Sequence, residues 1–316
     1  MQPHNRRKLH LTLGVALAAT ALATAGWSAD APKAATPAGP DFRTDSTLVL
    51  VPVTVMDRRG AVVNGLAGEA FTVMEDGAQR PIRWFSQDDA PVSLGIVLDL
   101  SGSMKGYAAA AKDSVKALLK DANPEDQVFV NGVSTQPRAY SGFEDSFEKT
   151  MSRVASEQAE GRTALIDTIC TSLSELRSGA HFRRALVVIS DGMDNHSRFT
   201  DAELRRLMAE SEAQIYTIAT VAVVEQRQPK QMVMTEAQRG RYFLEQLAGK
   251  GGGMSFTISS PADIAPAAAT IGRALRNQYT LGYAPGGSGS GKWHKIAVKV
   301  SGKGLTAYAR TGYRLD

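Results

Sequence analysis

The sequence predicts an α/β protein in which a doubly wound, mostly parallel sheet is inserted into a small all-β sandwich built from both flanks of the chain. Between residues 91 and 276, apolar strand-like runs alternate with segments whose apolar residues recur at helical spacing. The segments on either side hold short β-branched runs without a helical pattern. One run, Val92–Leu100, is almost continuously apolar, which is typical of a strand buried on both faces of a parallel sheet.

Composition excludes several classes of protein. With 316 residues, of which 43% are hydrophobic and 22% charged, the chain is neither collagen-like, nor a coiled coil, nor fully disordered. A single cysteine rules out an internal disulfide and a Cys-based zinc site, and five histidines disfavour a multi-His metal site. The formal charge of +4 falls to about +1 (4 − 3) without Arg6, Arg7 and Lys8, which lie in a segment that we expect to be removed. Nothing therefore indicates nucleic acid as a partner.

The N-terminal residues 1–25 have the layout of a secretory signal peptide. A basic start is followed by the apolar run Leu9–Ala25, with small residues suited to cleavage at its end. A transmembrane anchor is the alternative, but the run is shorter than the ~20 residues that a bilayer span needs. Paired arginines leave twin-arginine export open as well as the general route. We expect a secreted or periplasmic protein, a flexible tether over residues 26–43, and no later membrane span.

The two flanks, residues 44–90 and 277–316, are predicted to be β-structure. The expected strands are Thr47–Met56, Phe71–Met74 and Arg80–Phe85 in the first flank, and Gln278–Tyr283, Trp293–Val300 and Leu305–Ala309 in the second. Neither flank is long enough to bury a good core by itself. We therefore expect the flanks to pair with each other, and the alternative is two independent β appendages.

The region between them, residues 91–276, is predicted to hold five strands and five helices in alternation. The strands are Val92–Leu100, Gln127–Val130, Arg184–Ser190, Gln214–Val221 and Met254–Ile258, and the helices are Tyr107–Leu119, Ala164–Leu176, Asp201–Ala213, Gln238–Leu247 and Ala262–Leu275. Such alternation indicates parallel strands joined by right-handed crossovers. The polar stretch Val223–Glu236 is expected to be a loop.

Five oxygen-bearing residues are expected at the carboxyl ends of the strands, where open α/β sheets bind their ligands. They are Asp99, Ser101, Ser103, Thr163 and Asp191. Each residue alone could cap a helix or shape a turn. Together they favour a cation site, because hard oxygen ligands with few charges suit Mg²⁺, with Mn²⁺ or Ca²⁺ also possible.

The pattern D-x-S-x-S, then a threonine, then S-D-G resembles the metal-ion-dependent adhesion site of von Willebrand factor type A domains. The resemblance covers Leu94 to Leu275, and it implies a Rossmann-like fold. It also implies that Asp99, Ser101, Ser103 and Thr163 ligate the cation directly or through water. Asp191 would act through water, and a carboxylate of the partner would complete the shell.

The flanks extend this resemblance. The stretches Thr54–Gly60, Phe71–Gly77, Gln278–Tyr283 and Ala309–Tyr313 are similar to those of a bacterial family of exported "VWFA-related" proteins of acidobacterial type. The resemblance implies a mechanism of binding and leaves the partner unidentified.

Three further features are given structural or peripheral roles. Gly286–Lys292 matches G-x-x-x-x-G-K but lacks the following Ser or Thr and is followed by a predicted strand, so we expect a hairpin connection and no phosphate site. Cys170 lies on an apolar helix face and is expected to be an inert core thiol. Arg162 and the stretch Asp194–His196 are expected at the rim of the cation site.

Function is predicted to be divalent-cation-dependent binding of a protein partner that contributes an Asp or Glu to the metal. A metal-assisted hydrolase is an alternative, but no G-x-S-x-G motif or evident general base supports catalysis, so no enzymatic activity is expected. An assembly domain with a purely structural metal is the third possibility.

Overall fold

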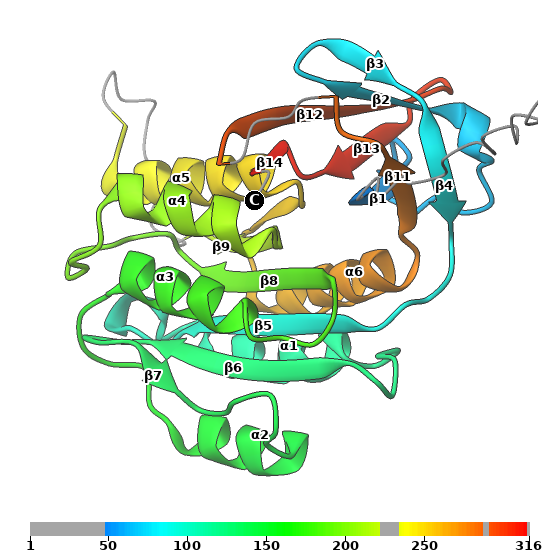
Figure 1. The fold of residues 1–316 in the computed structure, drawn as a ribbon. Coiled ribbons are helices and arrows are strands. Elements are labelled where there is room, and N and C mark those ends of the chain that lie inside the picture. Colours follow the sequence, from blue (N-terminus) through cyan, green and yellow to red (C-terminus); the bar gives the residue numbers. More distant parts are fainter. Residues whose placement is uncertain (1–47, 222–233, 287–290, 315–316) are drawn as a thin grey trace, which may run out of the picture. The chain divides into compact units, whose positions relative to one another are not determined.

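The computed structural model describes residues 48–221, 234–286 and 291–314. The expected signal peptide and tether lie outside these ranges, as does most of the expected loop at 223–236. Within the described ranges the strands form one six-stranded sheet and two four-stranded sheets (Figure 1).

The six-stranded sheet has the order β10-β9-β8-β5-β6-β7. Its strands are β5 (Val92–Asp99), β6 (Gln127–Val133), β7 (Arg138–Ala139), β8 (Arg183–Ser190), β9 (Gln214–Thr220) and β10 (Ser255–Ile258). Every pairing is parallel except that of the short edge strand β7 with β6. Strand β5 lies between β8 and β6 and is buried along its whole length, as its apolar run predicts.

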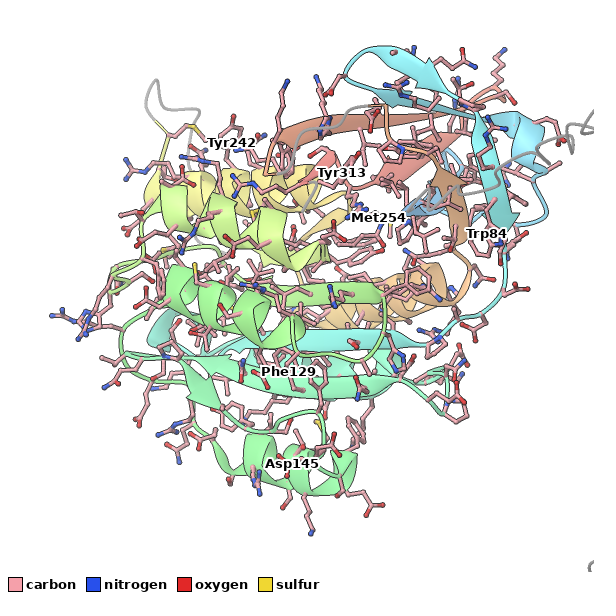
Figure 2. All side chains as sticks on the ribbon, viewed as in Figure 1. Trp84, Phe129, Asp145, Tyr242, Met254 and Tyr313 are labelled. Carbon is pink, nitrogen blue, oxygen red and sulfur yellow. The ribbon has the colours of Figure 1, made fainter. Side chains whose placement is uncertain are left out.

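Helices cover both faces of this sheet (Figure 1). They are α1 (Ala108–Leu118), α2 (Phe147–Ser156), α3 (Leu165–Leu176), α4 (Asp201–Ser211), α5 (Glu236–Gly251) and α6 (Ile264–Arg276). One core joins the sheet to α1 and α6 and includes Met254, and a second joins it to α3, α4 and α5 and includes Phe129 (Figure 2). The predicted doubly wound α/β fold is confirmed.

Two antiparallel sheets form the β-sandwich, with strand orders β13-β1-β11-β4 and β14-β12-β2-β3. The strands are β1 (Val49–Met56), β2 (Phe71–Glu75), β3 (Ala78–Arg80), β4 (Ile82–Ser86), β11 (Tyr279–Tyr283), β12 (Trp293–Val300), β13 (Thr306–Ala309) and β14 (Gly312–Arg314). Each sheet joins the two flanks: Val51 pairs with Leu281 in one, and Val73 with Val298 in the other. The expected pairing between the flanks is therefore present, and a common apolar core fills the space between the sheets.

The single strand expected over Arg80–Phe85 is wrong. Pro81 divides it into β3 and β4, which belong to different sheets. Proline has no N–H to donate to a ladder and fixes its own φ, so the chain leaves one sheet at this residue and enters the other. The strand expected to run to Leu100 ends at Asp99, and the strands β7 and β14 were not expected.

Helix α2 is also absent from the sequence-based expectation. Ser146 caps it by accepting a bond from the backbone N–H of Lys149, but only Thr150 and Val154 are buried along its length. Its apolar residues Phe147, Met151 and Val154 recur at helical spacing, so the sequence does carry a periodic signal for this helix.

A buried polar network joins the sandwich to the α/β region. The guanidinium of Arg183, 2% exposed, donates to the carbonyls of Ala90 and Leu275 and to Gln278 Oε1. Gln278 Nε2 in turn donates to Gln214 Oε1 at 2.6 Å and to the Tyr216 hydroxyl at 3.1 Å. The network thus fixes the two places where the chain passes between the sandwich and the inserted domain.

In the described ranges no helix has both the length and the apolar character required to span a bilayer.

Candidate metal centre

Asp99 is the last residue of β5, the strand at the middle of the sheet, and is fully buried. Its Oδ1 accepts a 2.9 Å bond from the backbone N–H of Ser101, and its Oδ2 accepts a 2.5 Å bond from Ser190 Oγ. Both contacts hold the carboxylate at the carboxyl edge of the sheet. The carboxylate does not cap a helix, which was the alternative role.

Ser101 and Ser103 follow on the short 3-10 turn that begins the connection to α1. Their Oγ atoms lie 3.2 Å apart, with Ser101 buried and Ser103 exposed. Ser101 occupies the N-cap position of the turn but its side chain makes no capping bond. The two hydroxyls are thus positioned side by side, one of them within reach of solvent.

The loop that carries Thr163 lies against this turn. Gly161 O accepts a bond from the N–H of Gly102 at 3.3 Å, and Leu100 O accepts one from Glu160 at 2.9 Å. Thr163 is 3% exposed and directly precedes Ala164, the N-cap of α3. The first turn of α3 is capped by Asp194 Oδ1, which accepts from Leu165 N, so capping is not what the Thr163 side chain does.

Asp191 follows β8, the neighbour of β5, and is 8% exposed. Its Oδ1 accepts a 3.0 Å bond from the N–H of Met193, which closes a turn around Gly192 at φ +77°. Shaping a turn, the alternative role of Asp191, is therefore observed, and metal binding stays a prediction. Asn195, on the same loop, accepts a bond from Thr163 N at 3.1 Å and so ties the third loop to the second.

The electrostatics of the cluster favour a cation. Burial raises the pKa of Asp99 to about 6, against the opposing effect of its hydrogen bonds with Ser101 and Ser190, and the negative charge of Asp191 raises it further. Neither carboxylate forms an ion pair with a basic side chain of the described residues. Two buried, unpaired acidic groups surrounded by hydroxyls form a donor set that fits a hard divalent cation.

This donor set is poor in strong ligands. Within the described residues, no group of three or more His, Cys, Asp and Glu side chains is arranged to hold a metal ion. Hydroxyl oxygens with one or two carboxylates suit a hard divalent cation that keeps several of its waters.

Residues 94–193 match the family model of the von Willebrand factor type A domain. This stretch is similar to von Willebrand factor type A domains. The matched stretch runs from β5 to the loop after β8 and includes all five candidate ligands. The resemblance to type A domains is confirmed for this part of the chain, and the metal-ion-dependent adhesion site stays a prediction.

Several solved structures are similar to the chain at low sequence identity. A von Willebrand factor type A protein from Catenulispora acidiphila is 11% identical, with a TM-score of 0.48, and the match covers 87% of this chain and 74% of that one. An aerotolerance-related membrane protein from Bacteroides fragilis is 17% identical, with a TM-score of 0.44 and coverage of 58% and 98%. Proximal thread matrix protein 1 from the mussel byssus is 17% identical, with a TM-score of 0.46 and coverage of 60% and 49%. This chain thus matches about half the length of the mussel protein, and no curated protein matches it.

Two functional roles near the candidate metal centre were missed. Ser190 is not among the predicted ligands, although its Oγ donates to Asp99 Oδ2 and accepts a bond from Gly192 N at 2.9 Å. Its place next to Asp191 at the end of a strand was the available signal. Asp194 was expected at the rim, but its Oδ1 accepts bonds from Leu165 N, Ile166 N and Ser197 Oγ, so this carboxylate is committed to holding α3.

Proposed function

We propose that this protein is an exported, divalent-cation-dependent binding module that captures an acidic group of a protein partner. The proposal rests on one observation above all. Asp99 and Asp191 place two acidic groups at the carboxyl edge of the sheet, buried and without a basic partner among the described residues. A protein keeps such groups charged only when a cation or strong donors compensate them.

Each candidate ligand has a distinct part in holding Mg²⁺. Asp99 supplies the main charge, Ser101 and Ser103 supply neutral hydroxyl oxygens, and Thr163 supplies another from the neighbouring loop. Asp191 contributes a second charge from β8. When bound, Mg²⁺ would supply residual positive charge and an exchangeable water position that an Asp or Glu of the partner can take.

The surroundings of the site suit an acidic partner. Ser103 is exposed, so an oxygen from outside can approach the place that it lines. Lys105 and Arg162, both exposed, lie on the same two loops as Ser103 and Thr163. Basic groups beside a cation raise the rate at which an acidic surface associates and disfavour basic partners.

Pull-down from a periplasmic extract tests the proposal. The mature protein should retain a partner in Mg²⁺, lose it in chelator, and recover it when Mg²⁺ is restored. Ser103→Ala should abolish retention, whereas Ser301→Ala, at another exposed serine, should leave it unchanged. A partner retained equally in chelator would contradict the proposal and would leave the metal a purely structural role.

A hydrolase is less well supported. A metal-assisted hydrolysis needs a general base near the cation. Asp194, the additional carboxylate on the loop after β8, already accepts three hydrogen bonds through one oxygen. We therefore propose binding without catalysis.

Export is the second part of the proposal. It rests on the signal-like layout of residues 1–25 and the Pro- and Ala-rich stretch that follows. Mass spectrometry of the protein recovered from the periplasm should show a new N-terminus close to Ala25, and an intact Met1 would contradict cleavage.

A further inference from the structure

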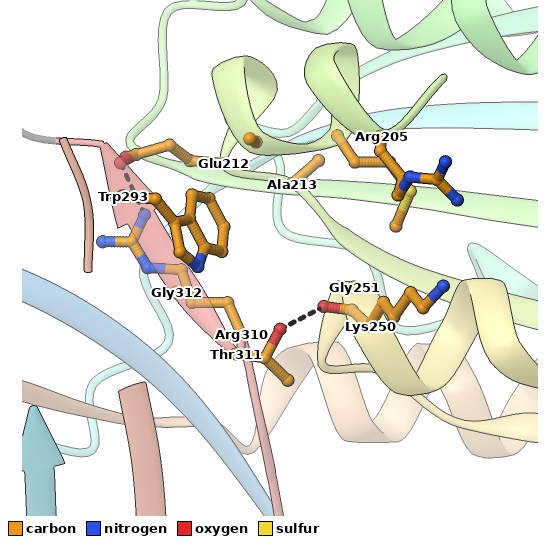
Figure 3. A pocket seen from close by; sticks show the side chains of 11 residues that line it. Arg205, Glu212, Ala213, Lys250, Gly251, Trp293, Arg310, Thr311 and Gly312 are labelled. Atoms are coloured by element: carbon orange, nitrogen blue, oxygen red, sulfur yellow. Dashed lines mark hydrogen bonds and ion pairs between the residues drawn. The ribbon is translucent and has the colours of Figure 1, made fainter. Parts of the chain in front are cut away.

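A pocket lies at the edge of the central sheet opposite the candidate metal centre (Figure 3). The metal centre follows the carboxyl ends of the parallel strands β5 and β8, whereas the pocket is lined by Ala213, which directly precedes the start of β9. The ends of α4 and α5 form one side, and the sandwich residues Trp293 and Arg310–Gly312 form the other. The pocket is therefore separate from the metal centre and combines the two parts of the fold.

Its walls are apolar, and one large aromatic side chain is exposed in it. Trp293, the first residue of β12, is 44% exposed. Gly312 makes room for the indole, because a Cβ at that residue would lie 2.3 Å from Trp293 Cζ2. On the opposite side, Met208, Ala213 and Gly251 supply small or flexible surfaces. An exposed tryptophan beside a hollow is the kind of residue that dominates binding energy at protein interfaces.

The charges around the pocket are mostly positive. Arg205, Lys250 and Arg310 line it together with one acidic residue, Glu212, and Arg205 is paired with Asp201 one turn earlier on α4. Arg310 is held in place by Glu212 Oε1 at 2.7 Å and by Leu50 O at 3.0 Å. Lys250 forms no ion pair with any described residue, so its charge remains available to a ligand.

The size of the cavity restricts what can occupy it. Its volume is about 270 Å³. Cofactors and drug-sized ligands occupy pockets of roughly 300–1,000 Å³. One bulky apolar side chain, with its flanking backbone along the rim, fits the volume better than a whole cofactor.

We propose that this pocket docks an acidic segment of a partner protein that inserts one bulky apolar side chain against Trp293. A flanking Asp or Glu residue of the segment would lie beside Lys250. This contact needs no metal, so it would act in addition to the cation site and independently of it.

Nuclear magnetic resonance of the mature protein tests the proposal directly. The probe is the acetylated and amidated peptide Asp-Glu-Phe-Glu-Asp, titrated while the indole N–H signals are followed. The Trp293 signal, assigned through Trp293→Phe, should shift and saturate, and the Trp84 signal on β4 should not move (Figure 2). The titration should be unchanged in chelator, which separates this site from the proposed cation-dependent function.

Variants of the peptide and of the protein complete the test. Replacing the peptide's Phe with Ala, or its acidic residues with Lys, should each weaken binding at least tenfold. Trp293→Ala and Lys250→Glu should do the same, whereas Trp84→Ala and Lys303→Glu, at exposed positions outside the pocket, should not. Equal shifts with the Ala peptide, no shift at millimolar peptide, or loss of the shift in chelator would each overturn the proposal.

Discussion

Asp99 holds its charge at a place where solvent cannot reach it. Burial is the main cause that raises its pKa to about 6, and the bonds from Ser101 and Ser190 reduce the effect without cancelling it. A cation bound beside Asp99 would favour the ionised form. Metal binding and proton binding at this residue therefore compete.

The affinity for Mg²⁺ should depend on pH for this reason. With a pKa of about 6, Asp99 is mostly ionised at pH 7 and mostly protonated at pH 5, so the association constant should fall about tenfold between them. Calorimetric titrations in buffers of different ionisation enthalpy measure both the affinity and the proton released. Asp201→Asn, at an exposed acidic residue, should keep this dependence, and an affinity independent of pH would contradict the role of Asp99.

The metal-free protein should show the opposite trend in stability. The folded-state pKa of Asp99 lies above its ordinary value of 3.8, so the native state binds more protons than the unfolded state between these two values. The free energy of unfolding should therefore fall as pH rises from about 4 to about 6, by up to about 3 kcal/mol. Urea denaturation in chelator measures this, and Asp99→Asn should flatten the profile. If the free energy of unfolding of Asp99→Asn depends on pH as steeply as that of the unmodified protein, a group other than Asp99 causes the dependence.

Gly192 is a residue whose lack of a side chain the candidate site requires. It has φ +77°, and a Cβ there would lie 2.1 Å from Gly240 O on α5. Gly192→Ala should destabilise the protein by about 2 kcal/mol or more and weaken metal binding, because the Asp191 loop must shift. Gly249→Ala is the matched control, since that residue lies within α5 with no atom near an added Cβ, and it should stabilise by about 0.5–1 kcal/mol. Thermal and urea unfolding measure both changes. Equal changes in stability for Gly192→Ala and Gly249→Ala would contradict the close contact between Gly192 and Gly240.

At the scale of elements, the junction between sandwich and α/β domain depends on polar groups as well as apolar packing. Burial is the main cause that lowers the pKa of Arg183 to about 10, with the nearby charge of Arg276 adding to it, so this side chain is still charged at neutral pH. Its guanidinium donates to the carbonyl oxygens of Ala90 and Leu275 and to Gln278 Oε1. The charge is thus stabilised by dipoles fixed in the fold.

Gln278→Leu should destabilise the protein strongly. It removes acceptors from Arg183 and donors to Gln214 and Tyr216 while burying a side chain of similar size. Leaving buried polar groups unpaired costs about 1–3 kcal/mol for each, so a loss of about 3 kcal/mol or more is expected in urea denaturation. Gln79→Leu on the exposed strand β3 should cost less than about 1 kcal/mol, and a similarly small effect at Gln278 would show that the network is dispensable.

Glu75 supports the sandwich in a comparable way. Burial alone would raise the pKa of Glu75, but the bonds from the Tyr313 hydroxyl, at 2.6 Å, and from Gly286 N, at 2.8 Å, together with the charge of Arg80, lower it overall. The stabilisation is present above the ordinary pKa of 4.5 and is lost as pH falls through the lowered folded-state value. Acid unfolding followed by circular dichroism should therefore be less steep below pH 4.5 in Glu75→Gln, which should already be less stable at pH 7. An unaltered acid transition would contradict this.

The sequence allowed much of the fold to be predicted because the signals were local. Buried parallel strands such as β5 are continuous apolar runs, and the shortness of each flank indicated that the flanks pair. The division at Pro81 depends on which sheet each half joins, so no local pattern predicts it. Helix α2, in contrast, has its apolar residues at helical spacing, a local signal that the prediction leaves unused. The five candidate ligands lie on three loops that contact one another, but the bond from Ser190 and the capping by Asp194 depend on tertiary contacts.

At the scale of the whole molecule, the insertion leaves two opposite edges of one sheet available for binding. The chain leaves the sandwich after β4 and returns in β11, and these strands pair with Phe85 opposite Leu281. The carboxyl edge carries the candidate metal centre, and the opposite edge carries the pocket between the sandwich and helices α4 and α5. Residues of the pocket are scattered from Arg205 to Gly312, so no local pattern in the sequence could reveal it.

The most direct test of the central claim is a calorimetric titration of Mg²⁺ into the mature protein at pH 7.5, repeated for Asp99→Asn. We expect one equivalent of Mg²⁺ to bind the unmodified protein and none to bind Asp99→Asn, with Asp201→Asn binding as the unmodified protein does. Asp99→Asn should remain folded, because replacing a buried carboxylate with an amide removes a charge that the metal-free fold does not pair. One equivalent bound by a folded Asp99→Asn would contradict the claim. So would the absence of binding by the unmodified protein at about 10 mM Mg²⁺, roughly ten times the dissociation constant of about 1 mM typical of the weakest calcium modules.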